Sequence, residues 1–174
     1  MDIRIANVID ESFVDGDGIR FSIFMQGCPH HCKGCHNPST HDFNGGSIID
    51  TEKLIKKFNS NPIINGITLT GGEPLCQIIA ATELAAAAKN SNLNVWCYTG
   101  YTYEYLIDEE STDNVFFTHT QINKFFDYID VLVDGSFIES QRDLTMQFCG
   151  SKNQRLIDLP KTRSQKKIIA WSLK

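Results

Sequence analysis

The sequence has no long hydrophobic run and no excess of positive charge. None of its apolar stretches approaches the roughly 18 residues that a membrane-spanning helix needs. Its 16 lysines and arginines are outnumbered by 21 aspartates and glutamates, which gives a net charge of −5. A protein held to nucleic acid by its overall charge would be basic. We therefore expect neither a membrane protein nor a nucleic-acid-binding one.

Internal repeats and low-complexity linkers are absent from the sequence, and we expect no secretory leader. Its first residues, "MDIRIANVIDESF", have neither the basic start nor the apolar core of a signal peptide, so we expect a cytoplasmic protein. In a reducing compartment, six cysteines are more typical of metal ligands or buried thiols than of disulfides. The 174 residues suit a single domain, predicted over residues 1–174, with a basic tail at 160–174.

Apolar runs alternate with helical patterns along the chain. Helices are predicted at residues 50–59, with Asp50 or Thr51 as a cap, at 78–90, at 120–129 and from about residue 103. Strands are predicted at residues 18–26, 65–72, 94–101, 130–135 and 165–171. This alternation favours parallel strands with outer helices. A complete (βα)8 barrel takes about 250 residues, so we predict an α/β fold that is an incomplete (βα) barrel or a small open sheet.

In such folds, ligands gather at the carboxyl ends of the parallel strands. Several chemically distinctive residues of this sequence follow directly after predicted strands. They are Cys28 after the first strand, Gly71 and Gly72 after the second, Thr99 and Gly100 after the third, and Asp134 after the fourth. The pattern therefore predicts one functional site at this edge of the sheet.

Three cysteines lie close together in "CPHHCKGCHNPST", residues 28–40. A zinc site of three cysteines and one histidine is chemically plausible, with His30, His31, His36 or His41 as the fourth ligand. Zinc ligands usually come as two pairs from separate segments, whereas these thiols share one loop. A 4Fe–4S cluster is broad enough for one loop to reach three irons, and its irons usually take four thiolates. The spacing favours a cluster with one open iron over zinc.

Two motifs resemble those of the radical S-adenosylmethionine superfamily. One is Cx3Cx2C directly after a first strand, at Cys28, Cys32 and Cys35, and the other is the "GGEP" of residues 71–74. The resemblance implies that the three cysteines hold a 4Fe–4S cluster whose fourth iron binds S-adenosylmethionine. It further implies an incomplete barrel of the radical S-adenosylmethionine type and an oxidoreductase that cleaves this cofactor reductively to a 5′-deoxyadenosyl radical.

Further stretches resemble one branch of that superfamily, the glycyl-radical-enzyme activating enzymes. "DGDGIRFSIFMQGC" (15–28) is similar to their lead-in, while 95–101, 131–137 and 142–158 are similar to activators of anaerobic ribonucleoside-triphosphate reductase. The resemblance implies that reductase as protein substrate and a flavodoxin-like electron donor. His36, after the third cysteine, is more typical of pyruvate formate-lyase activases. Activation of pyruvate formate-lyase or another glycyl-radical enzyme is thus the alternative, and a zinc-binding interaction module is the alternative of another class.

The resemblance also assigns cofactor contacts in the "GGEP" motif. Gly71 and Gly72 would offer their backbone to the cofactor, Gly72 beside its methionine part. Glu73 would orient the loop or contact the cofactor's amino group, and Pro74 would fix the turn.

Other contacts implied by the resemblance lie in the cysteine loop and at strand ends. Gly34 and His36 flank the third cysteine and would pack on the cofactor. Thr99, Asp134 and Ser136 are placed where related activases touch the ribose and the carboxylate. Asn153 and Arg155 are further candidates.

Three remaining features carry weaker signals. Cys76, two residues after the "GGEP" motif, is predicted to be a small buried residue at a helix start. The acidic run 108–113 is predicted to be a solvated loop. The tail 160–174 holds Lys161, Arg163, Lys166, Lys167 and Lys174 and no acidic residue. It fits either an edge strand protected by lysines or a docking element for the reductase or an acidic donor, and the former is slightly favoured.

Overall fold

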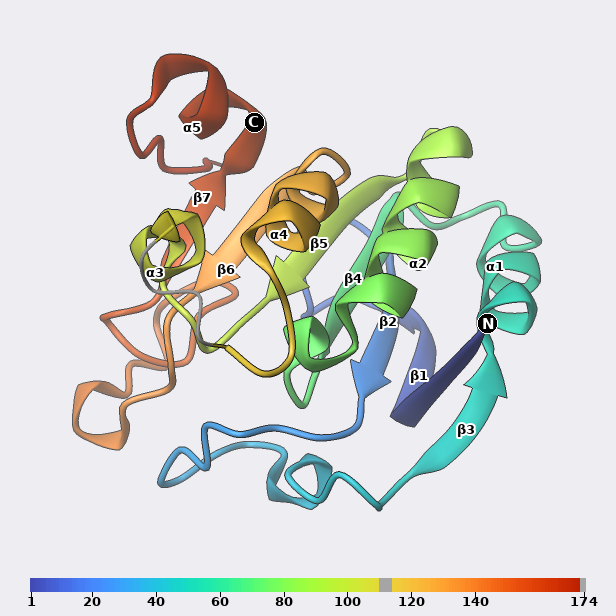
Figure 1. Ribbon diagram of the computed structural model, residues 1–174, viewed down its shortest axis with the longest axis horizontal. Coiled ribbons are helices and arrows are strands. Elements are labelled where there is room, and N and C mark those ends of the chain that lie inside the picture. The colour runs from blue at the N-terminus through green and yellow to red at the C-terminus, as the bar shows by residue number, and fades with distance from the viewer. Residues whose placement is uncertain (110–113, 173–174) are drawn as a thin grey trace.

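The computed structural model describes residues 1–109 and 114–172, so most of the acidic run 108–113 lies outside the described residues, as does Lys174. Its centre is one seven-stranded sheet with the strand order β3-β1-β2-β4-β5-β6-β7 (Figure 1). The strands are β1 (Asp2–Ser12), β2 (Arg20–Met25), β3 (Ser47–Asp50), β4 (Gly66–Gly71), β5 (Asn94–Tyr98), β6 (Val131–Asp134) and β7 (Arg155–Asp158).

The middle of the sheet is parallel and its margins are antiparallel. Strands β2, β4, β5 and β6 pair in parallel, as predicted from the alternating pattern. On one side β1 pairs antiparallel with β2 and with β3, and on the other side β7 pairs antiparallel with β6. The sheet is therefore mixed and open, with β3 and β7 as its edges, and it is not closed into a barrel.

The helices are α1 (Thr51–Asn59), α2 (Ile78–Asn90), α3 (Tyr103–Ile107), α4 (His119–Phe126) and α5 (Leu159–Gln165). In Figure 1, α1, α2 and α4 cover one face of the sheet, and α2 packs between the other two. The predicted cap of α1 is Asp50, whose Oδ1 accepts a hydrogen bond from the Glu52 N–H at 2.8 Å. None of the described helices combines the length and the apolar character that a membrane span requires.

The two faces of the parallel strands differ because successive side chains of a strand point to opposite sides. On β2, Phe21, Ile23 and Met25 are completely buried in the core beneath the helices. The opposite face carries Arg20, which is 1% exposed. Its guanidinium donates to Thr68 Oγ1 at 3.1 Å and to Asn94 Oδ1 at 2.9 Å. Burial lowers the pKa of Arg20 to about 10.

The face opposite α1, α2 and α4 is called the uncovered face here. Aromatic side chains pack around Arg20 on this face. The ring of Trp96 on β5 lies under the Arg20 guanidinium at 5.5 Å and meets the rings of Phe148 and Trp171 edge-on. The floor of this face is therefore packed at the end where the parallel strands begin. Open space remains at the end where they finish.

The strand predicted at 165–171 is confirmed only near its end, where Ala170 forms an isolated antiparallel bridge with Ile157 of β7. Residues up to Gln165 belong to α5, whose first turn is capped by Asp158, with Oδ1 accepting from the Lys161 N–H at 3.1 Å. Pro160 at the start of this helix is a typical helix-initiating residue. Beyond α5 the chain returns beside β7, where the Trp171 N–H donates to the Leu156 carbonyl at 2.8 Å. The protected edge predicted for the tail is thus a helix and a return segment.

Candidate functional site

A cavity of about 840 Å³ lies at the carboxyl ends of the parallel strands. This volume is within the range of roughly 300–1,000 Å³ that is common for ligand sites. The sulfur-bearing residues Cys28, Cys32 and Cys35 border it on one side. Other parts of the wall come from the ends of β4, β5 and β6 at residues 70–72, 98–100 and 135–137, and from residues 13–15, 143–144 and 146–150. Further lining residues are Phe24, Gln154 and, from the cysteine loop and the segment after it, His30, His36, Asn37 and His41.

The cysteine loop is fixed at its base by the chain around it. The Cys28 N–H donates to the His41 carbonyl at 3.2 Å, and the Cys35 N–H donates to the Cys32 carbonyl at 3.1 Å. Gln26, at the end of β2, supports the returning segment with hydrogen bonds from Nε2 to the Ser39 and Asp42 carbonyls. All six cysteines are free thiols. Burial raises the pKa of the Cys28 thiol to about 11, so ligation as a thiolate requires loss of this proton.

The arrangement of these side chains distinguishes the two candidate metal centres. Among the described residues, no three histidine, cysteine, aspartate or glutamate side chains come close enough to hold one metal ion. A zinc site needs thiolate sulfurs within about 2.3 Å of the ion, so the zinc alternative gains no support. A 4Fe–4S cluster spreads its irons and so suits three separated thiols of one loop that border a cavity. His41 Nε2, at the same cavity, is buried without a hydrogen-bond partner. These residues fit a cluster with space for a second ligand beside it.

The glycines of the "GGEP" turn bring β4 against the start of the cysteine loop. Gly71 has φ +97°, and a Cβ there would lie 2.6 Å from the Phe24 and Met25 backbone. A Cβ on Gly72 would lie 2.4 Å from the Gly27 carbonyl oxygen. The Glu73 N–H donates to that same carbonyl at 2.8 Å. Both positions need glycine for this close backbone approach, and both border the cavity.

Glu73 is completely buried and faces protein groups. Its Oε1 accepts from the Leu75 N–H at 3.1 Å. Its Oε2 accepts from Thr99 Oγ1 at 3.0 Å and from the Gly100 N–H at 2.8 Å, and lies 2.8 Å from His30 Nε2. Of the two roles considered for Glu73, this geometry favours orientation of the loop. Pro74 follows as the first residue of the 3-10 helix η2 (Pro74–Gln77) and is buried.

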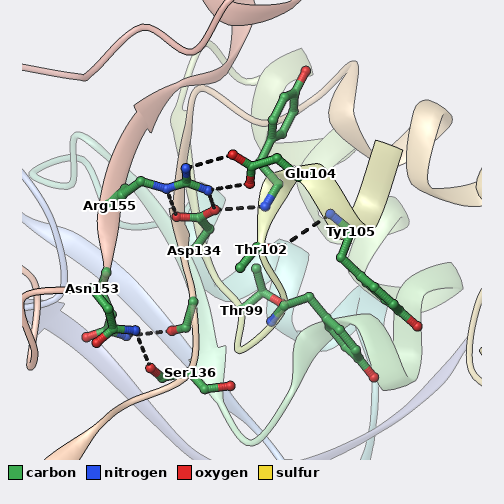
Figure 2. Close-up of polar contacts among 12 residues, drawn as sticks. Thr99, Thr102, Glu104, Tyr105, Asp134, Ser136, Asn153 and Arg155 are labelled. Carbon is green, nitrogen blue, oxygen red and sulfur yellow. Dashed lines mark hydrogen bonds and ion pairs between the residues drawn. The ribbon is translucent and has the colours of Figure 1, made fainter. Parts of the chain in front are cut away.

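Asp134 is also completely buried, behind the wall at the end of β6 (Figure 2). Its Oδ1 accepts from Arg155 Nε at 2.9 Å, and its Oδ2 accepts from the Tyr103 N–H at 2.8 Å and from a second guanidinium nitrogen. Arg155 also binds both oxygens of Glu104, at 2.8 and 2.6 Å. Hydrogen bonding to Arg155 lowers the pKa of Glu104 to about 2.

Ser136, two residues later, does border the cavity. Its Oγ donates to the Gly100 carbonyl at 2.8 Å, and its own carbonyl accepts from Asn153 Nδ2 at 2.8 Å (Figure 2). Gln154 Nε2 donates to the neighbouring Gly135 carbonyl at 2.9 Å. Asn153 and Gln154 therefore hold this part of the wall from the β7 side.

The structure separates the predicted site residues into two groups. Bordering the cavity are Cys28, Cys32, Cys35, His36, Gly71, Gly72, Thr99 and Ser136. The others lie behind or beside its wall: Gly34, Glu73, Pro74 and Asp134. At Gly34 a Cβ would face the side chains of Glu139 and Phe137. Cys76 is half-buried, and burial raises the pKa of its thiol well above the ordinary value.

Sequence reasoning did not identify three features of the site. His30, named from the sequence only as a possible zinc ligand, contacts Glu73. Cys149, not singled out in the sequence, borders the cavity. The exposed apolar side chains of Phe13, Val14 and Leu144 also border it. The position of His30 between two predicted cysteine ligands could have indicated its role. No local sequence pattern indicates that Cys149 or the three apolar side chains border the cavity, because only the fold brings their segments together.

Comparisons with known proteins agree with a cluster site. Residues 14–157 match a family model described as a 4Fe-4S single cluster domain. A Vibrio cholerae protein named anaerobic ribonucleoside-triphosphate reductase-activating protein is 34% identical over 149 residues, covering 81% of this chain and 88% of that protein. Proteins of the same name from Haemophilus influenzae and Enterobacteria phage T4 are 31% and 32% identical; the matches cover 81% and 83% of this chain, and 88% and 86% of those proteins.

Proposed function

The chain belongs to the family of anaerobic ribonucleoside-triphosphate reductase-activating proteins, and we propose that it generates the glycyl radical of such a reductase. The observation that carries this proposal is the cavity that three thiols of one loop share with the ends of β4, β5 and β6. It offers a cluster three ligands and leaves room for a second group beside the open iron. Despite His36, the named relatives favour the reductase over pyruvate formate-lyase as the protein substrate.

The cofactors of this activity are a 4Fe–4S cluster and S-adenosylmethionine. Cys28, Cys32 and Cys35 would hold the cluster as thiolates. When bound, the two groups supply the one-electron cleavage of a carbon–sulfur bond and the removal of a hydrogen atom from a glycine of the reductase. The protein itself binds, orients and shields them.

Each part of the cavity wall has a separate proposed task. The turn at Gly71 and Gly72 offers backbone groups next to the loop that carries Cys28, while Thr99 and Ser136 offer hydroxyl groups from the neighbouring strand ends. The ring of His36 lies 5.1 Å from that of Phe137 and would pack along the cofactor, with Gly34 shaping the loop before it. Glu73, Pro74 and Asp134 would act from behind the wall.

The open sheet suits a protein substrate. We propose that residues 1–174 form one activase domain whose sheet is an incomplete barrel of the radical S-adenosylmethionine type. The exposed side chains of Phe13, Val14 and Leu144 border the cavity and would meet a glycine-bearing segment that enters it. The reductase would complete the enclosure that keeps water from the reaction.

Reduction requires an external donor, which we propose to be a flavodoxin-like protein in the cytoplasm. Six free cysteines accord with a reducing compartment. The basic tail is not a good docking site for this donor. The Leu159 N–H at the start of α5 donates to the Asp130 carbonyl, just before β6 begins, so α5 lies at the end of the sheet away from the cysteine loop (Figure 1).

The test is an anaerobic reconstitution followed by electron paramagnetic resonance spectroscopy. We expect a reduced 4Fe–4S signal that changes on addition of S-adenosylmethionine, and a glycyl radical doublet once an anaerobic ribonucleoside-triphosphate reductase is added. A reconstituted protein that consumes S-adenosylmethionine but yields no glycyl radical with such reductases would contradict the proposal.

A further inference from the structure

A buried hydrogen bond joins the middle of the cysteine loop to the "GGEP" turn behind the cavity wall. His30 lies midway between Cys28 and Cys32, and its Nε2 is 2.8 Å from Glu73 Oε2. The His30 side chain is 15% exposed and that of Glu73 is 0% exposed. By contrast, the ion pair between Lys33 of the same loop and Glu139 is 90% and 50% exposed. Exposed pairs contribute little, whereas a buried hydrogen bond to a carboxylate holds its partners firmly.

The Glu73 carboxylate connects three segments of the site. Its Oε2 accepts hydrogen bonds from Thr99 Oγ1 and the Gly100 N–H at the end of β5, in addition to its contact with His30. Its Oε1 accepts from the Leu75 N–H and so fixes the "GGEP" turn. The Glu73 side chain therefore holds the cysteine loop, the end of β4 and the end of β5 in position relative to one another.

The His30 ring packs against the residues that follow β5, Gly100 and Tyr101. A Cβ at Gly100 would lie only 2.4 Å from the ring, so glycine is what allows the ring to rest there. The ring of Tyr101 meets it edge-on at 4.6 Å between centroids. These contacts determine where the ring lies, and the hydrogen bond determines its orientation. The histidine therefore spans the gap between loop and wall with little freedom.

We propose that His30 is a positioning residue that sets the cysteine loop relative to the cavity wall, so that the cluster and S-adenosylmethionine meet in the correct geometry. The inference rests on the proposed function, because it assigns His30 a role in that site. In this proposal the three cysteines are the cluster ligands, and His30 acts through the contact of its Nε2 with Glu73. Loss of this contact leaves the three cysteines able to hold the cluster, but the loop no longer has a fixed distance from Gly72 and Thr99.

The test compares three variants of the full chain. His30→Leu removes the hydrogen bond and keeps apolar bulk, while His30→Gln restores a side-chain N–H that can reach Glu73. His31→Asn is the matched control, because His31 is the next residue of the same loop, is exposed, and has φ +46°, which asparagine tolerates. Each variant is reconstituted anaerobically, and its iron content, its reduced spectrum and its dissociation constant for S-adenosylmethionine are measured.

We expect His30→Leu to keep a full cluster and to bind S-adenosylmethionine about tenfold more weakly, the effect of one lost hydrogen bond to a charged group. His30→Gln should recover most of this affinity, and His31→Asn should equal the wild type. Hydrogen exchange of the cluster-free protein gives a second readout. Amides of residues 28–36 should exchange faster in His30→Leu than in wild type, and at the wild-type rate in His31→Asn.

Three results would overturn the proposal. They are wild-type affinity in His30→Leu, equal weakening in His30→Gln and His30→Leu, and loss of the cluster from His30→Leu, which would place His30 in ligation or loop folding. Failure of the wild-type protein itself to bind S-adenosylmethionine would instead contradict the proposed function, so the two failures are distinguishable.

Discussion

Two completely buried carboxylates stand at the ends of parallel strands in this protein, and they have different partners. Glu73, after β4, accepts hydrogen bonds from backbone and hydroxyl groups and contacts a histidine of the cysteine loop. Asp134, at the end of β6, binds the guanidinium of Arg155 and the N–H of Tyr103 at the start of α3. The first carboxylate links parts of the site to each other, whereas the second links elements of the fold.

Burial at a strand end therefore does not by itself indicate a ligand contact. On the cysteine side of the cavity, substitutions should change cofactor binding and leave stability nearly intact. On the β7 side, they should change stability first. Four predictions test this division, in order of decreasing expected effect.

The largest effect should follow loss of a cluster ligand. Cys32→Ser should abolish glycyl radical formation, because serine does not replace a thiolate in holding iron, while the thermal unfolding midpoint of the cluster-free protein should stay unchanged. Cys76→Ser is the matched control, since Cys76 is half-buried but does not border the cavity. It should retain the cluster and the radical yield measured by spin quantitation. A normal radical yield in Cys32→Ser would contradict the assignment of Cys32 as a cluster ligand.

The next effect concerns stability on the β7 side. Arg155→Leu leaves Asp134 buried without its cation, and we expect a loss of about 3 kcal/mol in the free energy of unfolding, since breaking a buried pair costs about 3–5 kcal/mol and Arg155 is partly exposed. Urea denaturation measures this loss. Arg163→Leu breaks the ion pair with Asp127, which is exposed, and should cost less than about 1 kcal/mol. Equal losses of unfolding free energy in the two variants would show that the Asp134–Arg155 pair does not stabilise the fold more than an exposed ion pair does.

A smaller effect should appear as a dependence of stability on pH. The pKa of Glu104 is lowered from 4.5 to about 2 by Arg155, so the folded state binds this proton less readily than the unfolded chain does. Its stabilising contribution is therefore present above pH 4.5 and is lost as the pH falls towards 2. Glu104→Gln should flatten the decline in the urea midpoint between pH 5 and about pH 2.5. An unchanged decline would mean that Arg155 does not hold Glu104 in solution.

The smallest effect is expected for the basic tail. Lys167→Gln and the double variant Lys166→Gln/Lys167→Gln change exposed residues at the end of the sheet opposite the cysteine loop. The rate of cluster reduction by a flavodoxin, followed by stopped-flow absorbance, should match that of the wild type at low ionic strength. A severalfold slower reduction would assign a docking role to the tail after all.

The parallel centre of the fold could be predicted because its strands are continuously apolar and its helices have clear caps. The predicted bounds of α1 and α2 agree with the structure within one residue. The long strand β1 was not predicted, because most of its residues are exposed or half-buried and it lacks a clear apolar alternation. Strand β7 has only four residues and was not predicted, while the strand predicted at 165–171 forms only a bridge at Ala170 beside it.

The sequence predicted which backbone segments meet at the site better than it predicted which side chains point into the cavity. Position at a strand end correctly indicated which segments meet at the cavity. The period of two along a strand then decides which side chains point into it. Val131 and Val133 of β6 pack with Trp96 on the uncovered face, so the intervening Leu132 and the following Asp134 point the other way. Partners such as His30 and Glu73 depend on long-range packing that no local pattern encodes.

The packing of side chains on the uncovered face of the sheet affects how substrates enter the cavity and how products leave it. Arg20, Trp96 and Trp171 pack together at the end where the parallel strands begin and do not line the cavity, so the cavity does not reach that end of the face. Under the proposed function, the reductase covers the open side of the cavity during hydrogen transfer. Methionine and 5′-deoxyadenosine are then enclosed until the reductase departs. Each encounter would deliver one radical, and fresh cofactor could enter only after the two proteins had separated.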